Sequence, residues 1–191
     1  MKVSILITFI SVLPIFPNTY YSEDFSSSVG SEWSSGKTDQ APSGEDFLGQ
    51  FANDKISLSL NNLPEHNEIT ISFDLYIIYS MDGNNGDMWS MEVAGGQNLL
   101  NTTFANPINS SSTILQSYPD NYPSSNPPQT GAVAVNALGY DDYSNGYINP
   151  SFGDSTYHLE YTFDHSSDDI VLNFEGSGMQ KIQDESWGID N

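Results

Sequence analysis

Apolar and polar positions alternate in several separate runs along the chain. The longest run has one apolar face, formed by Ile69, Ile71, Phe73, Leu75 and Ile77. Shorter runs with the same period cover residues 56–60, 89–93, 156–163 and 170–175. Successive side chains of a β-strand point to opposite faces, so a two-residue period predicts strands with one face in a core. No stretch has the 3.6-residue period of an amphipathic helix.

Turn signals separate these runs. They are Asn61-Asn62-Leu63-Pro64, Asp82-Gly83-Asn84-Asn85-Gly86 and Gly176-Ser177-Gly178. Short strands at such intervals are typical of sandwiches and barrels. We therefore expect an all-β protein that forms a two-sheet antiparallel sandwich of the jelly-roll type. Its predicted core contains Ile71, Phe73, Leu75, Ile77, Leu159, Tyr161, Phe163, Leu172 and Phe174, with Trp89 and Trp187 beside them.

Residues 107–150 have a different composition, rich in Pro, Asn, Ser and Tyr. This composition predicts one long loop, with a strand near residues 132–138. Loops of this length inside a domain are uncommon and often functional. Tyrosine supplies contact area with only two side-chain torsions to restrict on binding. We therefore expect an exposed ligand-binding surface formed by Tyr118, Tyr122, Tyr140, Tyr143 and Tyr147.

The N-terminus has the layout of a secretory signal peptide. A lysine at position 2 is followed by an almost wholly apolar run to Phe16 and a polar exit. The run is shorter than the roughly 20 apolar residues of a membrane-spanning helix, and no second such run follows. We expect residues 1–20 to be removed and the protein to be secreted or displayed at the cell surface, with no transmembrane span left. Because no A-x-A-like cleavage site is obvious, an uncleaved anchor is the alternative.

The remainder divides into two parts. Residues 21–46 are interpreted as a first strand with a Ser/Gly-rich segment, and residues 47–191 as the sandwich domain. The chain stops where another sheet edge begins, so one interpretation is that it is a fragment of a longer protein.

Charge and composition exclude several classes of function. The chain has 4 Lys and no Arg against 25 Asp and Glu, a formal net charge of −21. Nucleic-acid binding depends on Lys and Arg contacts to phosphates, so we do not expect this protein to bind nucleic acid. The absence of cysteine excludes disulfides, thiolate metal sites and cysteine nucleophiles. Carboxylates remain as possible ligands for calcium, which prefers oxygen donors.

The turn from Asp82 to Asp87 is a candidate calcium loop. It packs two carboxylates and two amides into six residues, and short Asp and Asn side chains are frequent calcium ligands. The spacing differs from that of an EF-hand, and a hairpin turn rich in Asn-Gly explains the same residues. Further acid pairs are Asp141-Asp142, Asp168-Asp169 and Asp184-Glu185, and we expect most of these to be solvated loop charges.

Two sites match the acceptor motif for N-glycosylation. They are Asn101, followed by Thr102-Thr103, and Asn109, followed by Ser110-Ser111.

Several segments together resemble an extracellular module of large secreted bacterial and protist proteins, some of which carry PEP-CTERM-type sorting tails. The segments are FLGQFANDKISLSLNNLP, ISFDLYIIYSMDGNNGDMW, LLNTTFAN, QSYPDNYPSSNPPQTGAVAVNALGY and DESWGIDN. The closing WGIDN is similar to the last strand of jelly rolls such as MAM-like domains, reelin repeats and carbohydrate-binding modules. The resemblance implies a structural calcium shared by Asp190 and an acid of the first strand, Glu23 or Asp24.

Three functions are compatible with these features. The first is an extracellular module that binds a neutral glycan and holds a structural calcium, because neutral sugars need aromatic rings and amides rather than basic side chains. The second is a structural or adhesive surface protein that contacts other proteins without a sugar site. The third is a carbohydrate-active hydrolase.

Overall fold

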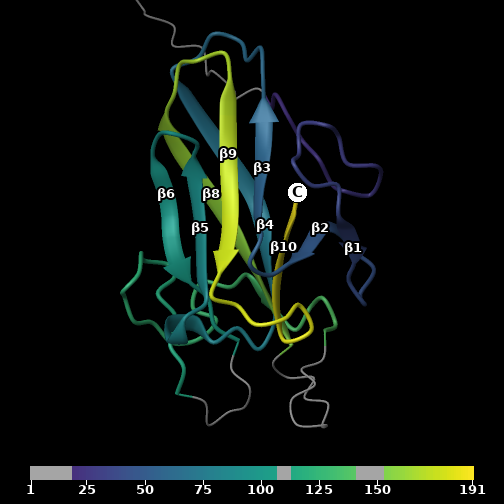
Figure 1. Cartoon of the computed structure of the whole chain (residues 1–191), viewed down its shortest axis with the longest axis vertical. Coiled ribbons are helices and arrows are strands. Elements are labelled where there is room, and N and C mark those ends of the chain that lie inside the picture. Colours follow the sequence, from purple (N-terminus) through teal and green to yellow (C-terminus); the bar gives the residue numbers. More distant parts are fainter. Residues whose placement is uncertain (1–18, 107–112, 141–152) are drawn as a thin grey trace, which may run out of the picture.

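The computed structural model describes residues 19–106, 113–140 and 153–191, which form two packed β-sheets (Figure 1). The strands are β1 (Thr38–Gln40), β2 (Asp46–Phe51), β3 (Lys55–Leu60), β4 (Glu68–Tyr79), β5 (Met88–Val93), β6 (Asn98–Thr103), β7 (Ala134–Val135), β8 (Asp154–Asp164), β9 (Ile170–Ser177) and β10 (Glu185–Asp190). One 3-10 turn, η1 (Gly83–Asn85), lies between β4 and β5.

The strand order confirms the predicted jelly roll. One sheet has the order β1-β2-β10-β4-β8-β7 and the other β3-β9-β5-β6, and the paired strands are antiparallel. The short edge strands β1 and β7 can be left out and the eight long strands renumbered from 1 to 8 along the chain. The strand orders of the two sheets are then 1-8-3-6 and 2-7-4-5. This is the double Greek-key order of a jelly roll, in which the first and last long strands lie side by side.

The two inner faces form the main core, as the alternation predicts. Of the nine predicted core residues, seven are buried there, and Ile71 and Tyr161 are partly buried against it. Trp89 and Trp187 are fully buried, with their ring centroids 6.0 Å apart. Phe25 and Trp33, from the segment before β1, complete this core.

A second, smaller cluster covers part of the outer face of the larger sheet. It joins Phe47 of β2 and Tyr76 and Ile78 of β4 to Leu138 and Tyr140 of the long loop. Strand β2 is therefore buried on both faces, with Leu48 in the main core and Phe47 in the outer cluster.

The described part of the long loop, residues 113–140, folds over one end of the sandwich. A buried glutamine, Gln116, organises it. Its Oε1 accepts hydrogen bonds from the backbone N–H of Gln129 (2.8 Å) and from the Tyr157 hydroxyl (3.1 Å), and its Nε2 donates to the Thr130 carbonyl (2.9 Å). The strand predicted near residues 132–138 is only two residues long, β7.

Candidate metal centre

Three carboxylates meet at the end of the sandwich where β4 ends and β10 begins. Asp82 and Asp87 stand on either side of η1, and Glu185 is the first residue of β10. The turn between the two aspartates closes tightly because Gly83 and Gly86 adopt positive φ angles of 58° and 146°. One ligand oxygen from each of the three side chains lies within 4.8 Å of the others. We call this cluster the acidic trio.

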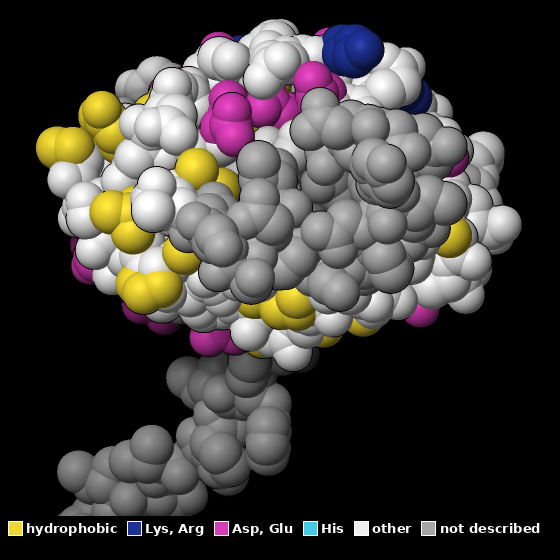
Figure 2. Space-filling model, turned by 90° about the horizontal axis from the view of Figure 1, so that it is seen from below, with side chains coloured by type: hydrophobic (Ala, Val, Ile, Leu, Met, Phe, Trp, Pro, Cys, Tyr) yellow, Lys and Arg dark blue, Asp and Glu magenta, His cyan; other side chains and the backbone are white. Residues whose placement is uncertain are grey.

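Two members of the acidic trio are removed from solvent. Asp87 is 3% exposed and Glu185 is 0% exposed, whereas Asp82 is half-buried. Figure 2 views the molecule from this end and shows Asp and Glu side chains gathered on the surface. Burial of carboxylates without compensation is costly, because water no longer solvates their charge.

Hydrogen bonds hold the trio in place. The Asp87 carboxylate accepts from the backbone N–H of Asp82. Glu185 Oε2 accepts from the backbone N–H of Gln180 (2.6 Å), and its Oε1 accepts from the Gln180 side-chain amide (3.2 Å). The turn before β10 is thereby fastened to the same carboxylate.

Burial shifts the proton equilibria of all three groups in the same direction. It raises the pKa of Asp87 to about 6 and that of Glu185 to about 7, and the neighbouring negative charges add to both shifts. Burial also raises the pKa of Asp82, with a further contribution from Asp184.

No basic side chain of the described residues neutralises the trio. The ion pairs within 4 Å in that part of the chain join Lys55 to Glu92 and Glu175, and His158 to Asp74. A buried carboxylate cluster of this kind is stable when it takes up protons or a cation.

The donor set of the trio fits calcium. It consists only of carboxylate oxygens, which suit hard cations rather than zinc or copper. Two oxygens that each lie roughly 2.4 Å from one calcium are at most roughly 4.8 Å apart, so the observed clustering is compatible with a shared ion. Most of the further acid pairs were expected to be solvated loop charges, and Glu185 is an exception because it pairs with Tyr79 at the start of β10 and is fully buried.

Asp190 and the acids near the N-terminus lie elsewhere. Asp190 is buried, and its carboxylate accepts a hydrogen bond from the Tyr76 hydroxyl (2.9 Å). Asp24 is exposed and bonds to Ser26, whereas Glu23 accepts from the backbone N–H of Phe25 (3.2 Å). The negative charge of Asp24 contributes to a raised pKa of Asp190, for which burial is the main cause. A calcium shared by these residues stays a prediction.

The predicted tyrosine surface is only partly present in the described residues. Tyr122 is 46% exposed. Tyr118 is half-buried against Phe104 and Tyr157, with ring centroids 4.9 and 5.1 Å away. The expected exposure is wrong for Tyr140, which belongs to the outer cluster because its ring packs against Tyr79. Tyr143 and Tyr147 lie outside the described residues.

One of the two glycosylation motifs lies within the described residues. Asn101 is half-buried on β6, and its motif partner Thr103 is buried, with its hydroxyl donating to Asn84 Oδ1 (2.5 Å). Asn109 lies outside the described residues. Glycosylation at either position stays a prediction.

A serine, a histidine and an aspartate are bonded in a row on the exposed face of β4 and β8. Ser72 Oγ lies 3.2 Å from His158 Nε2, and His158 Nδ1 lies 2.7 Å from Asp74 Oδ1. This is the order of contacts in a Ser-His-Asp triad. Acyl transfer also needs a pocket that positions the substrate beside the nucleophile. The row stands on the open face of a sheet, where cross-strand polar pairs contribute to sheet stability.

Comparisons with protein-family models, with characterised proteins and with solved structures find no match to this chain. Within the described residues, no helix has the length and apolar character needed to cross a bilayer.

Proposed function

We propose that this protein is a secreted, calcium-stabilised binding domain whose ligand is a neutral glycan. The observation that carries the proposal is the acidic trio. Three carboxylates from two segments far apart in the sequence converge in a place with little access to water and no basic partner among the described residues. In this role the ion neutralises the trio and fastens the start of β10 to the turn before β5.

The charge of the chain supports a neutral ligand. With a formal net charge of −21, the protein repels acidic polysaccharides and nucleic acids at long range. A neutral glycan is recognised through hydroxyl hydrogen bonds and contacts with aromatic rings, which do not require basic residues.

Calcium should raise the thermal stability of the purified protein, and EDTA should lower it. An ion that binds only the folded state contributes about 2.7 kcal/mol at a free concentration one hundred times its dissociation constant. Replacing Glu185 by Gln should abolish the response, because the variant lacks one anionic ligand of the trio. The melting temperature is measured in calcium and in EDTA by differential scanning fluorimetry.

Two further variants make this experiment specific. Glu160→Gln removes an exposed carboxylate of β8 and should keep the full calcium response. Asp190→Ala tests the calcium position implied by the closing strand, and it abolishes the response only if that position is the one occupied. A wild-type protein whose melting temperature is the same in calcium and EDTA contradicts the calcium part of the proposal.

Secretion has a direct test. N-terminal sequencing of material recovered from the medium of the producing cells should begin near residue 20, because the signal peptide is removed during export. Secreted protein that begins at Met1 contradicts this prediction.

The ligand class is tested on an array of neutral and acidic glycans, probed with the mature protein in calcium and in EDTA. We expect binding to neutral glycans in calcium. A blank array, together with binding to cell-surface proteins, supports the structural or adhesive function instead.

A further inference from the structure

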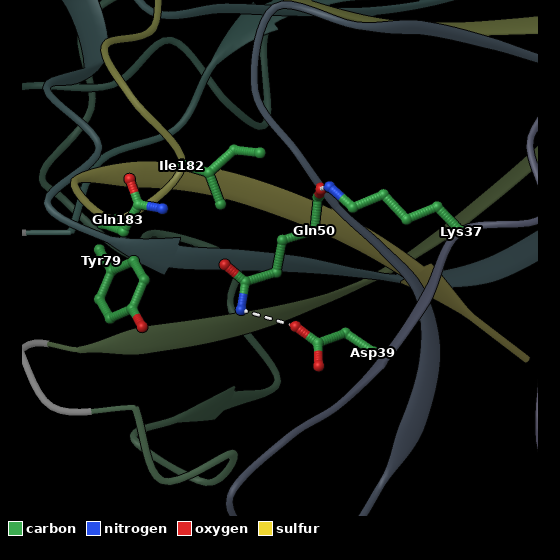
Figure 3. Close-up of a pocket in the computed structure, with 6 residues that line it drawn as sticks. All are labelled: Lys37, Asp39, Gln50, Tyr79, Ile182 and Gln183. Carbon is green, nitrogen blue, oxygen red and sulfur yellow. Dashed lines mark hydrogen bonds between the residues drawn. The ribbon is translucent and has the colours of Figure 1, made fainter.

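A cleft of about 390 Å³ opens beside the acidic trio (Figure 3). It is lined by Lys37, Asp39, Gln50, Tyr79, Ile182 and Gln183. These side chains come from β1 and the residue before it, from β2, from the end of β4, and from the connection between β9 and β10. The volume lies in the range of about 300–1,000 Å³ that is usual for small-molecule sites.

A buried amide, that of Gln50, is held rigidly in this cleft. Its Oε1 accepts a hydrogen bond from the Ser186 hydroxyl (2.9 Å). Its Nε2 donates to the Tyr140 hydroxyl (3.1 Å) and to Asp39 Oδ2 (3.2 Å). The contacts fix the orientation of both the amide and the Asp39 carboxylate before any ligand arrives, which reduces the entropy lost on binding.

The aromatic ring of the cleft, that of Tyr79, takes its position from an unusual backbone. Tyr79 has a φ of 65°, a conformation that is costly for a bulky residue. It is held there by its N–H, which donates to the Gly153 carbonyl (2.7 Å), and by its carbonyl, which accepts from the Asn106 amide (3.0 Å). The φ angle interrupts the alternation of β4, so Tyr79 joins Ile78 on the outer side of the sheet.

The Tyr79 ring packs edge-on against Tyr140, with centroids 5.4 Å apart. It remains half-buried and lines the cleft. In Figure 3, Tyr79 and Gln183 lie on one side of the cleft and Lys37 on the other, with Gln50 between them. The Tyr79 ring therefore shares the cleft with the polar side chains of Gln183 and Asp39.

The charges that line the cleft are balanced, which is unusual on so acidic a protein. One ammonium and one carboxylate, those of Lys37 and Asp39, face it. Lys37 Nζ donates to the Gln50 carbonyl and stands 5.6 Å from the centroid of the Phe51 ring, so this charge is already engaged within the protein. The cleft thus has no excess charge to select an ionic ligand.

We infer that this cleft binds one sugar residue of a neutral glycan. The inference rests on the proposed function and names its site. The sugar hydroxyls bond to the Gln183 amide and to the Asp39 carboxylate, which Gln50 holds in place, and the apolar face of the ring lies against Tyr79. The turn with Ile182 and Gln183 leads directly into Glu185, so the acidic trio supports one side of the cleft.

The test has two stages, so that the proposed function and the location of the site can fail separately. In the first stage, the wild-type mature protein is titrated in calcium with neutral oligosaccharides built from glucose, mannose, galactose or xylose, and with polygalacturonate as an acidic comparison. Isothermal titration calorimetry gives the dissociation constants. We expect measurable binding to at least one neutral oligosaccharide and none to polygalacturonate. No binding to any neutral oligosaccharide overturns both the inference and the glycan part of the proposed function.

In the second stage, the neutral oligosaccharide that binds is titrated into variants. Tyr79→Ala should weaken binding at least tenfold, and Gln183→Ala should weaken it severalfold. Gln183 is exposed, so its variant tests the site even if Tyr79→Ala unfolds. Gln97→Ala, an exposed glutamine between β5 and β6, is the matched control and should bind as the wild type does. Full affinity in the Gln183 variant and in a folded Tyr79 variant, with loss of binding in Tyr122→Ala, overturns the cleft as the site and leaves the glycan function standing.

Discussion

Replacing Phe73 by Ala should lower the free energy of unfolding by about 3–5 kcal/mol, the usual cost of truncating a buried phenylalanine. Phe73 belongs to β4 of the larger sheet and is 6% exposed. Its ring lies 5.5 Å from that of Phe174 on β9 and 6.3 Å from that of Trp89 on β5, so it joins the two sheets. Truncation leaves a cavity between them.

Urea denaturation in the presence of calcium measures this effect. The neighbouring variant Ser72→Ala, on the exposed face of the same strand, removes one cross-strand contact to His158 and should cost about 1 kcal/mol or less. Phe73→Leu, which keeps most of the volume, should cost less than Phe73→Ala. A Phe73→Ala protein with an unchanged denaturation midpoint contradicts the assignment of this face to the core.

The fold was largely predictable from the sequence because most strands are buried on one face. β4 and β8 show the resulting alternation clearly. β2 does not, because Phe47 and Leu48 point into different clusters and both faces are covered. β6 was also missed. Its buried positions include Thr102 and Thr103, which point to opposite faces and whose hydroxyls bond to the long loop and to Asn84, so the strand shows no alternation of apolar and polar residues in the sequence.

The candidate metal centre was predictable only in part. Asp82 and Asp87 are close in sequence, and a turn of short polar residues indicates oxygen ligands. Glu185 comes from a distant segment, and only the pairing of β10 with β4 brings it beside them. No local pattern reveals such a partner.

The cleft left no signal in the sequence. It draws its residues from separate segments, and its aromatic member depends on the φ of one residue. The alternation of β4 places Tyr79 on the inner face, and a single positive φ reverses that. Because Tyr79 lies on the outer side of the sheet, Tyr140 packs against it. The Tyr140 side chain is therefore buried, although it was expected to be exposed.

Without calcium, the protein should lose stability as the pH rises from about 4 to about 7. Burial raises the pKa of Glu185 from its ordinary 4.5 to about 7 and that of Asp87 to about 6. Between the ordinary and the raised pKa, the folded state binds more protons than the unfolded state, so the free energy of unfolding falls with increasing pH. At about 1.4 kcal/mol per pH unit, Glu185 alone accounts for about 3 kcal/mol.

Calcium should reverse this trend, because the ion binds the deprotonated carboxylates and its affinity rises with pH. The measurement is the free energy of unfolding from pH 4.5 to 8.5, in EDTA and in calcium.

Other acids, including Asp154 and Asp190, have raised pKa values and contribute to the slope of this free energy with pH. The informative quantity is therefore the difference between the wild type and Glu185→Gln, whose amide carries no charge. In EDTA that variant should be the more stable protein at pH 8, and in calcium the less stable one. Glu160→Gln, which changes an exposed carboxylate, should follow the wild type in both conditions. Parallel curves for the wild type and Glu185→Gln would show that the trio carries no buried charge and binds no calcium.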